Sequence, residues 1–256
     1  MAPQPKSIAD EIGEDIAGLI NTGVIFAPDD PRILELEERG KKLAKSFPGT
    51  GYVDLAAVSM LCGNYSQMFD RYKIALSNGA NYSDKTNYGT ALAHSGYYSK
   101  AATIFKSVLD KLDDPVFAVS KAVLGMQFRL FTDLTQKLDL MHPEGTNNGF
   151  SKEARNEYLG FSQLLMEMKM DDSTIAGIMD MAGQVLREHK TYSKSVSDLL
   201  TTKNNEPEKS IVVCTLRIPK GCSEASDMTM EFADHYLASK YASFADKYMV
   251  RFAGEY

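Results

Sequence analysis

The residues that could do chemistry are few and widely spaced in this chain of 256 residues. There are four histidines, His94, His142, His189 and His235. None of them belongs to an HExxH motif or to a paired CxxC and HxxxH pattern, so zinc binding has no support in the sequence. Glu231 lies four residues before His235 on a predicted helix, a spacing that suits either two metal ligands or a solvated pair of side chains. We favour the solvated pair and expect no metal and no cofactor.

The three cysteines, Cys62, Cys214 and Cys222, match no CxxC metal or redox spacing. Cys62 and Cys214 stand among apolar residues and are interpreted as buried, unreactive thiols. Cys222 follows Lys220 at a predicted helix start, which could lower the pKa of a thiol, although an ordinary loop position is the simpler interpretation. The chain also lacks a GxSxG elbow, a P-loop and a GxGxxG turn, so we assign no catalytic residue.

Composition narrows the class of protein. The apolar fraction of 44%, the charged fraction of 24% and the net charge of −6 are those of an acidic globular protein. Lysines and arginines are scattered among acids, so we expect no nucleic-acid partner. No apolar run approaches the roughly 20 residues that span a bilayer, and acids interrupt the apolar N-terminal stretch. With an odd cysteine count, these features predict a cytoplasmic protein without membrane contact.

Helix signals dominate the pattern up to residue 190. Ser7 and Asp10 form a capping-box pattern ahead of an apolar helical face. Asp30 followed by Pro31 starts a second helix, and "FPGTG" at 47–51 is expected to end it.

At least eight helices are expected in residues 7–190. Residues 114–141 predict two helices or one that bends near Gly125. Ser151 and the "DDST" stretch at 171–174 each begin another helix.

Two stretches in the middle of this region repeat one pattern. Residues 52–79 and 85–112 each contain two helix-length segments joined at a glycine. The matching pairs are 33 residues apart: Gly63 and Gly96, Tyr65 and Tyr98, and Leu76 and Leu109. This spacing predicts a helix-turn-helix repeat rather than a plain helical bundle.

The second unit resembles a tetratricopeptide repeat, whose period is near 34 residues. The positions that carry the resemblance are Gly89, Gly96, Tyr98, Ala101, Phe105 and Leu109. The first unit departs from the motif because Met68 stands where a small residue is expected. The resemblance covers about residues 49–115, and it implies a mostly α fold, an α-solenoid or superhelix of antiparallel helix pairs over residues 1–195.

The same resemblance implies a binding site. Members of that family often bind peptides or helices in the groove lined by the first helix of each pair. Carried over to this chain, the groove candidates are Val53, Ala57, Met60, Thr86, Asn87, Thr90 and His94. Asn87 suits a clamp for a C-terminal carboxylate, but His94 replaces the lysine that such a clamp uses. An amphipathic segment therefore fits this groove better than a free carboxylate.

The pattern changes in the last quarter of the chain. A polar linker is predicted at 196–209, followed by a strand–helix–strand unit at 210–256 that packs on the helical domain. The inward face of the predicted helix is expected to comprise Met230, Ala233, Leu237, Tyr241 and Phe244. The two strands are expected to pair with each other, or to recruit a partner strand and so allow a homodimer.

Three functions fit these observations. The first is a non-catalytic scaffold that binds a peptide or protein in the groove of the helical repeats. The second is an acidic protein of the immunity or antitoxin kind that masks a basic toxin or enzyme. The third is an enzyme or ligand sensor with a site between the two parts, around His235 and Cys222.

Overall fold

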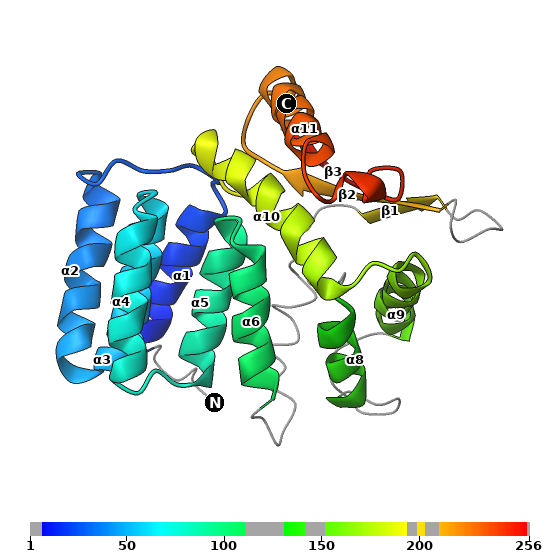
Figure 1. Cartoon of the computed structure of the whole chain (residues 1–256). Coiled ribbons are helices and arrows are strands. Elements are labelled where there is room, and N and C mark those ends of the chain that lie inside the picture. The colour runs from blue at the N-terminus through cyan, green and yellow to red at the C-terminus, as the bar shows by residue number, and fades with distance from the viewer. Residues whose placement is uncertain (1–6, 111–130, 142–151, 194–198, 203–209, 255–256) are drawn as a thin grey trace.

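The computed structural model describes residues 7–110, 131–141, 152–193, 199–202 and 210–254. Within them a series of helices is followed by a small sheet with one helix packed on it (Figure 1). The helices before the sheet are α1 (Ile8–Ile20), α2 (Pro31–Ser46), α3 (Pro48–Leu61), α4 (Tyr65–Ser77), α5 (Tyr82–His94), α6 (Tyr98–Leu109), α8 (Thr132–Met141), α9 (Lys152–Glu167) and α10 (Asp172–Glu188). None of the helices in these ranges is both long enough and apolar enough to cross a membrane.

Three predicted helix starts are confirmed, and the one predicted at Ser151 lies outside the described residues. The Ser7 hydroxyl accepts the backbone N–H of Asp10 at 3.2 Å, which completes the capping box of α1. Asp30 accepts the N–H of Arg32 at 2.9 Å at the start of α2. Asp171 does the same for the N–H of Thr174 at 2.8 Å ahead of α10. Each of these three helices therefore begins where a short polar side chain satisfies an otherwise unpaired N–H group.

The prediction for "FPGTG" is only half right. Phe47 does end α2, but Pro48 is already the first residue of α3. Proline is well suited to this position, because a first-turn N–H would have no partner within the helix. Gly51 then faces Ala44, and a Cβ atom at Gly51 would overlap the Ala44 backbone. These small residues let α2 and α3 approach each other closely. No loop longer than Phe47 separates the two helices.

The two predicted helix pairs are confirmed as α3–α4 and α5–α6. Gly63 and Gly96 stand in the two connections with φ of +69° and +73°, a conformation that favours glycine. Gly89 lies against Phe105 of α6, and a Cβ atom there would be 3.0 Å from the Phe105 ring. The two pairs differ at one matched position, because Leu76 is 45% exposed whereas Leu109 is buried.

Consecutive helices pack against each other, and α3 lies in the middle of them. It contacts α2 and α4, its neighbours in the chain, and also α1 and α5. Its buried residues accordingly point in every direction around the helix. The neighbouring helix α1 buries Ile12, Ile16 and Ile20. Burial of each of these side chains contributes about 1.5–3 kcal/mol to stability. The helix α1 is therefore a firmly attached wall beside α3.

The helix α10 links the helical region to the sheet. It contacts α6 on one side and α11 (Cys222–Leu237) on the other, and runs obliquely between them in Figure 1. One face of the helix is buried and includes Ile175, Ile178, Ala182, Val185 and Leu186. Most of the predicted helical stretch 114–141 lies outside the described residues, apart from α8 and the residue before it.

The C-terminal strands pair as predicted. Strand β2 (Ile211–Arg217) runs parallel to β3 (Tyr248–Ala253), with Cys214 opposite Val250. Alternate residues of the two strands, and Ile218 just after β2, are buried: Val212, Cys214, Leu216, Ile218, Tyr248, Val250 and Phe252. The helix α11 makes the crossover between these two strands and packs on β3.

A third strand, β1 (Leu199–Thr202), lies within the predicted linker and pairs antiparallel with β2. The sequence does not predict it, because four residues in a polar stretch carry little strand signal of their own. The strand order is β1-β2-β3, so β1 bonds to the edge of β2 that is opposite β3.

The inward face predicted for the last helix is wrong at Met230 and Leu237, whereas Tyr241 and Phe244 do pack against the core, beyond the end of the helix. Met230 and Leu237 are each 63% exposed, and the helix ends at Leu237. The residues that α11 buries are Ala225, Met228, Phe232 and Tyr236. Both sets follow helical spacing, so only the packing against β3 and α10 decides which one faces inward.

Candidate functional site

Two hollows flank α3 on different sides. One lies among α2, α3 and α4, and the other among α1, α3 and α5. They differ in whether their polar groups are satisfied within the chain, and this difference identifies the candidate site.

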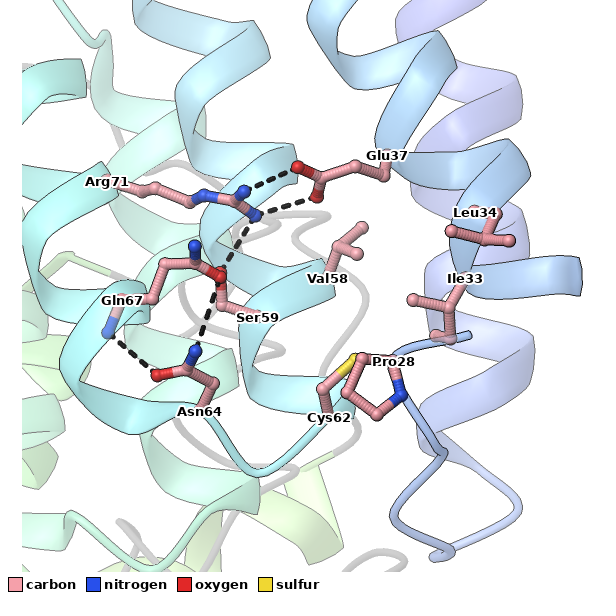
Figure 2. A pocket seen from close by; sticks show the side chains of 10 residues that line it. All are labelled: Pro28, Ile33, Leu34, Glu37, Val58, Ser59, Cys62, Asn64, Gln67 and Arg71. Atoms are coloured by element: carbon pink, nitrogen blue, oxygen red, sulfur yellow. Dashed lines mark hydrogen bonds and ion pairs between the residues drawn. The ribbon is translucent and has the colours of Figure 1, made fainter. Parts of the chain in front are cut away.

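The hollow among α2, α3 and α4 has a volume of about 220 Å³ and is shown in Figure 2. Arg71 forms a two-pronged ion pair with Glu37, with N–O distances of 2.5 and 2.8 Å. The same guanidinium donates to the Leu55 carbonyl at 2.8 Å and to the Ser59 hydroxyl at 2.9 Å. Ser59 in turn donates to the side-chain oxygen of Gln67 at 3.2 Å. The polar groups of this hollow are thus bonded to one another.

Electrostatics support a structural role for this network. Burial alone would raise the pKa of the Glu37 carboxyl, but the hydrogen bond and charge of Arg71, aided by Lys41, leave that pKa lowered. The ion pair joins α2 to α4 across α3. The two charges neutralise each other, so neither is available to bind a ligand. We therefore assign the ion pair to the stability of the fold.

Replacing Arg71 with Met is expected to lower the free energy of unfolding by about 2–3 kcal/mol, because Glu37 would keep its charge in a half-buried place. The measurement is urea unfolding followed by circular dichroism. Lys73→Met is the control, since the Lys73–Asp70 pair is exposed and should contribute little. An equal loss in both variants would contradict a specific role for Arg71.

The hollow among α1, α3 and α5 is larger, with a volume of about 660 Å³, and we call it the groove. It is lined by Ala9, Asp10, Gly13, Glu14, Ile16, Ala17 and Ile20 of α1, by Val53, Asp54 and Ala57 of α3, and by Ser83, Asn87, Tyr88, Thr90 and Ala91 of α5. Most of these side chains are small or aliphatic. Its volume is in the range of known ligand sites.

Asp54 is the unusual residue of the groove. Its side chain is only 7% exposed, and in the described part of the chain no donor reaches its Oδ2 atom. Burial, and secondarily the negative charge of Asp84, raise the pKa of the Asp54 carboxyl to about 7. A carboxyl group that is buried, unpaired and shifted in this way is a candidate for function.

Asp84 differs from Asp54 because the fold accounts for it. Its carboxylate accepts the backbone N–H of Asn81 at 2.9 Å and closes the capping box of α5. It also accepts the Thr50 hydroxyl at 3.3 Å. Asp54 has no comparable task in capping a helix or joining two elements.

The structure places the seven predicted groove residues in two groups. Four line the groove: Val53, Ala57, Asn87 and Thr90. The other three, Met60, Thr86 and His94, are buried at 0%, 5% and 6% exposure and do not line it. That any of the seven binds a partner stays a prediction.

His94 is held by the segment that follows α10. Its Nδ1 lies 2.8 Å from the carbonyl oxygen of Ser193, and burial lowers the pKa of its ring. The neighbouring Tyr192 is fully buried, and its hydroxyl donates to the Met60 carbonyl. The segment 191–193 therefore covers the ends of α3 and α5, which explains why Met60 and His94 are withdrawn from the groove.

A second group of titratable residues lies where α10 meets α11. Glu188, Glu231 and His235 each offer a ligand atom, and these atoms lie within 4.8 Å of one another, so the three could hold a divalent cation. His189 lies 2.8 Å from Glu231 and lowers the pKa of that carboxyl through its hydrogen bond. The structure thus brings Glu188 and His189 to the Glu231–His235 pair that the sequence analysis identified.

Cys222 and His235 do not form one site. They occupy the two ends of α11, which separates them by roughly 20 Å at 1.5 Å per residue. Cys222 is exposed, Cys214 is fully buried, and Cys62 is half-buried. Burial, followed by the charge of Glu37, raises the pKa of the Cys62 thiol.

One rapidly reacting thiol is therefore expected in the native protein. Ellman's reagent should label Cys222 first, because it is exposed, and reach Cys62 and Cys214 mainly after unfolding. The variant Cys222→Ser should lose the fast phase, whereas Cys214→Ser should keep it. A fast phase that persists in Cys222→Ser would contradict this assignment.

Sequence reasoning missed Asp54 and the contribution of α1. A signal for Asp54 was present, since it is the only charged residue in "PGTGYVDLAAVSML", a stretch that is otherwise apolar or neutral. A helix of that composition is usually buried on all sides, which makes a single acid within it conspicuous. No comparable signal shows that α1 would pack beside α3, because that contact depends on the tertiary fold.

No protein-family model matches this chain, and neither a curated protein nor a solved structure does. The function is accordingly inferred from the groove.

Proposed function

We propose that this protein is a non-catalytic scaffold that binds a segment of another protein in the groove of α1, α3 and α5. The observation that carries the proposal is Asp54, a buried carboxyl whose Oδ2 has no hydrogen-bond donor among the described residues, in a hollow with a mainly apolar surface. Leaving such a group unpaired costs about 1–3 kcal/mol or more, which a bound partner could recover.

The arrangement of α1 to α6 supports a tetratricopeptide-like solenoid as the frame of this scaffold. The pairs α1–α2, α3–α4 and α5–α6 would be three units, and their first helices contact one another in the order α1, α3, α5. In solenoids, stacked units create an extended concave surface, which is where such proteins bind partners. The groove lies on these three first helices.

An enzyme is a weaker interpretation of the same residues. A carboxyl whose pKa is raised to about 7 could serve as a general acid. Ser83, Asn87 and Thr90 could serve a polar substrate, but the larger part of the groove surface is apolar and includes Ile16, Ile20 and Val53. That surface suits the apolar face of a protein segment.

A masking role toward a basic enzyme or toxin is the second candidate. It is favoured by the acids Asp10, Glu14 and Asp54, because among the described residues that line the groove none is Lys, Arg or His. Stoichiometric co-purification with one basic protein, together with loss of that protein's activity on binding, would distinguish masking from a general scaffold.

The test of the proposed function is to fill the groove. Ala57→Trp should place a bulky ring on α3 inside the groove, whereas Ala238→Trp places the same ring on an exposed site at the end of α11. Both variants and the wild type are used for affinity capture from the producing cells, with quantitative mass spectrometry. A true groove partner is lost with Ala57→Trp, is kept with Ala238→Trp, and binds the purified wild type in calorimetry. Capture that Ala57→Trp leaves unchanged would refute the proposal.

A further inference from the structure

We infer that the groove binds a helical protein segment that places the ammonium or guanidinium group of a Lys or Arg side chain against Asp54. This inference rests on the proposed function and adds to it the chemical class of the partner. It follows from the position of Asp54, the charges around it, and the backbone of the groove walls.

The first step concerns the unmet bonding capacity of Asp54. A carboxylate accepts several hydrogen bonds, and Asp54 lies in the groove wall with its Oδ2 unpaired among the described residues. Its neighbour Asp84 adds negative charge without donating to it. A cation supplied by a ligand would satisfy the carboxylate and offset both charges.

The second step concerns the sign of the charge. Asp10 and Glu14 of α1 line the same groove, and its described lining contains no basic side chain. Three carboxyl groups around one hollow attract a cation and oppose an acidic ligand. The partner is therefore expected to carry a positive charge at the position that faces Asp54.

The third step concerns the form of the partner. The groove walls are all helical, and their backbone groups are used within α1, α3 and α5, so an extended strand would find no edge to pair with. A helix satisfies its own backbone and needs only side-chain contacts. The aliphatic stem of Lys or Arg can lie along Ile16, Val53 and Ala57 while its charged end reaches Asp54.

The raised pKa of Asp54 predicts how binding of such a partner depends on pH. The titratable groups around Asp54 are Asp84 and Tyr88 of α5, and Asp10 and Glu14 of α1. With the pKa of Asp54 raised to about 7, a cationic partner must displace its proton, so affinity should rise as the pH increases through that value. The variant Asp54→Asn should lack this dependence.

The experiment uses phage-displayed peptides of about 15 residues, long enough to form a helix, with one face randomised. Peptides selected on the full-length wild type are synthesised and titrated against Asp54→Asn, Ala57→Trp and Asp227→Asn. Asp227 is exposed on α11, so its variant makes the same charge change away from the groove. Spermidine and arginine amide are titrated as free cations.

The expected result is a Lys or Arg at one fixed position of the apolar face, with affinity about 30-fold lower for Asp54→Asn and unchanged for Asp227→Asn. Replacing that residue of the peptide with Gln should weaken binding to the wild type but hardly affect binding to Asp54→Asn.

Three results would overturn the inference. The first is a set of peptides that lose binding to Ala57→Trp but contain no Lys or Arg, or bind Asp54→Asn as well as the wild type. These peptides would refute the role of Asp54 and leave the proposed function intact. Free spermidine or arginine amide binding more tightly than any peptide would assign the site to a small amine. If no peptide is sensitive to Ala57→Trp, the inference and the proposed function both fail.

Discussion

Replacing Asp54 with Asn is expected to stabilise the free protein above neutral pH and to leave its stability nearly unchanged in acid. The Asp54 carboxyl has a pKa of about 7 in the folded chain, against an ordinary value of 3.8 that it regains on unfolding. Between these two values the folded state holds a proton that the unfolded state has lost. The free energy of unfolding therefore falls as the pH rises through this window.

The asparagine variant does not titrate and should avoid this loss. At about pH 8 we expect it to exceed the wild type by about 2–4 kcal/mol in the free energy of unfolding, and at about pH 4 to agree within about 1 kcal/mol. Urea unfolding at the two pH values measures both differences.

Asp227→Asn is the control for the change in charge, and it should show no comparable gain at either pH. An Asp54→Asn variant that is less stable than the wild type at about pH 8 would contradict the description of Asp54 as buried and unpaired. A gain in stability accompanied by a loss of peptide binding would be the pattern expected of a residue kept for function at the expense of stability.

Replacing Gly183 with Ala is expected to have the second large effect. Gly183 of α10 lies directly against Gly96 in the α5–α6 turn, and a Cβ atom at Gly183 would overlap the Gly96 carbonyl oxygen. Backbone cannot yield as a flexible side chain does, so α10 would have to move away from the turn. We expect a loss of about 3 kcal/mol or more.

Arg187 makes this contact more sensitive. Its guanidinium donates to the Gly96 carbonyl at 2.7 Å and to the Ser95 carbonyl at 3.2 Å, and it lies 4.1 Å from the centre of the Tyr97 ring. A shift of α10 would weaken these bonds together with the glycine contact. The loss should therefore appear in urea unfolding of the whole chain.

Gly18→Ala is the matched control for Gly183→Ala. Gly18 lies within α1, and a Cβ atom there would meet nothing within 4 Å. Alanine in an exposed helical position should raise the free energy of unfolding by about 0.5–1 kcal/mol. If Gly183→Ala were as stable as Gly18→Ala, the close approach of α10 to the α5–α6 turn would be contradicted.

The helices were largely predictable because their starts are local. The caps at Ser7, Asp30 and Asp171 lie within a few residues of the backbone groups that they satisfy, so their patterns suffice to locate α1, α2 and α10. The turn glycines Gly63 and Gly96 were predictable for the same reason, since a positive φ is a property of a single residue.

The errors arose where local patterns allow two answers. The last helix carries two apolar faces, and packing against β3 and α10 selected the one with Phe232 instead of the one with Met230. The short strand β1 has little propensity of its own and exists through its ladder with β2. In both places the partner surface is distant in sequence, so no window of residues contains the answer.

The candidate site shows the same division. The sequence by itself determined an acidic, mostly helical chain with paired helices, and it placed Val53, Ala57, Asn87 and Thr90 on the first helices of two pairs. Only the tertiary structure decided that α1 closes the groove, that segment 191–193 withdraws Met60 and His94 from it, and that Asp54 lies within it unpaired. Helix formation depends on neighbours along the chain, whereas the burial and pairing of a charge depend on residues brought together from distant parts of it.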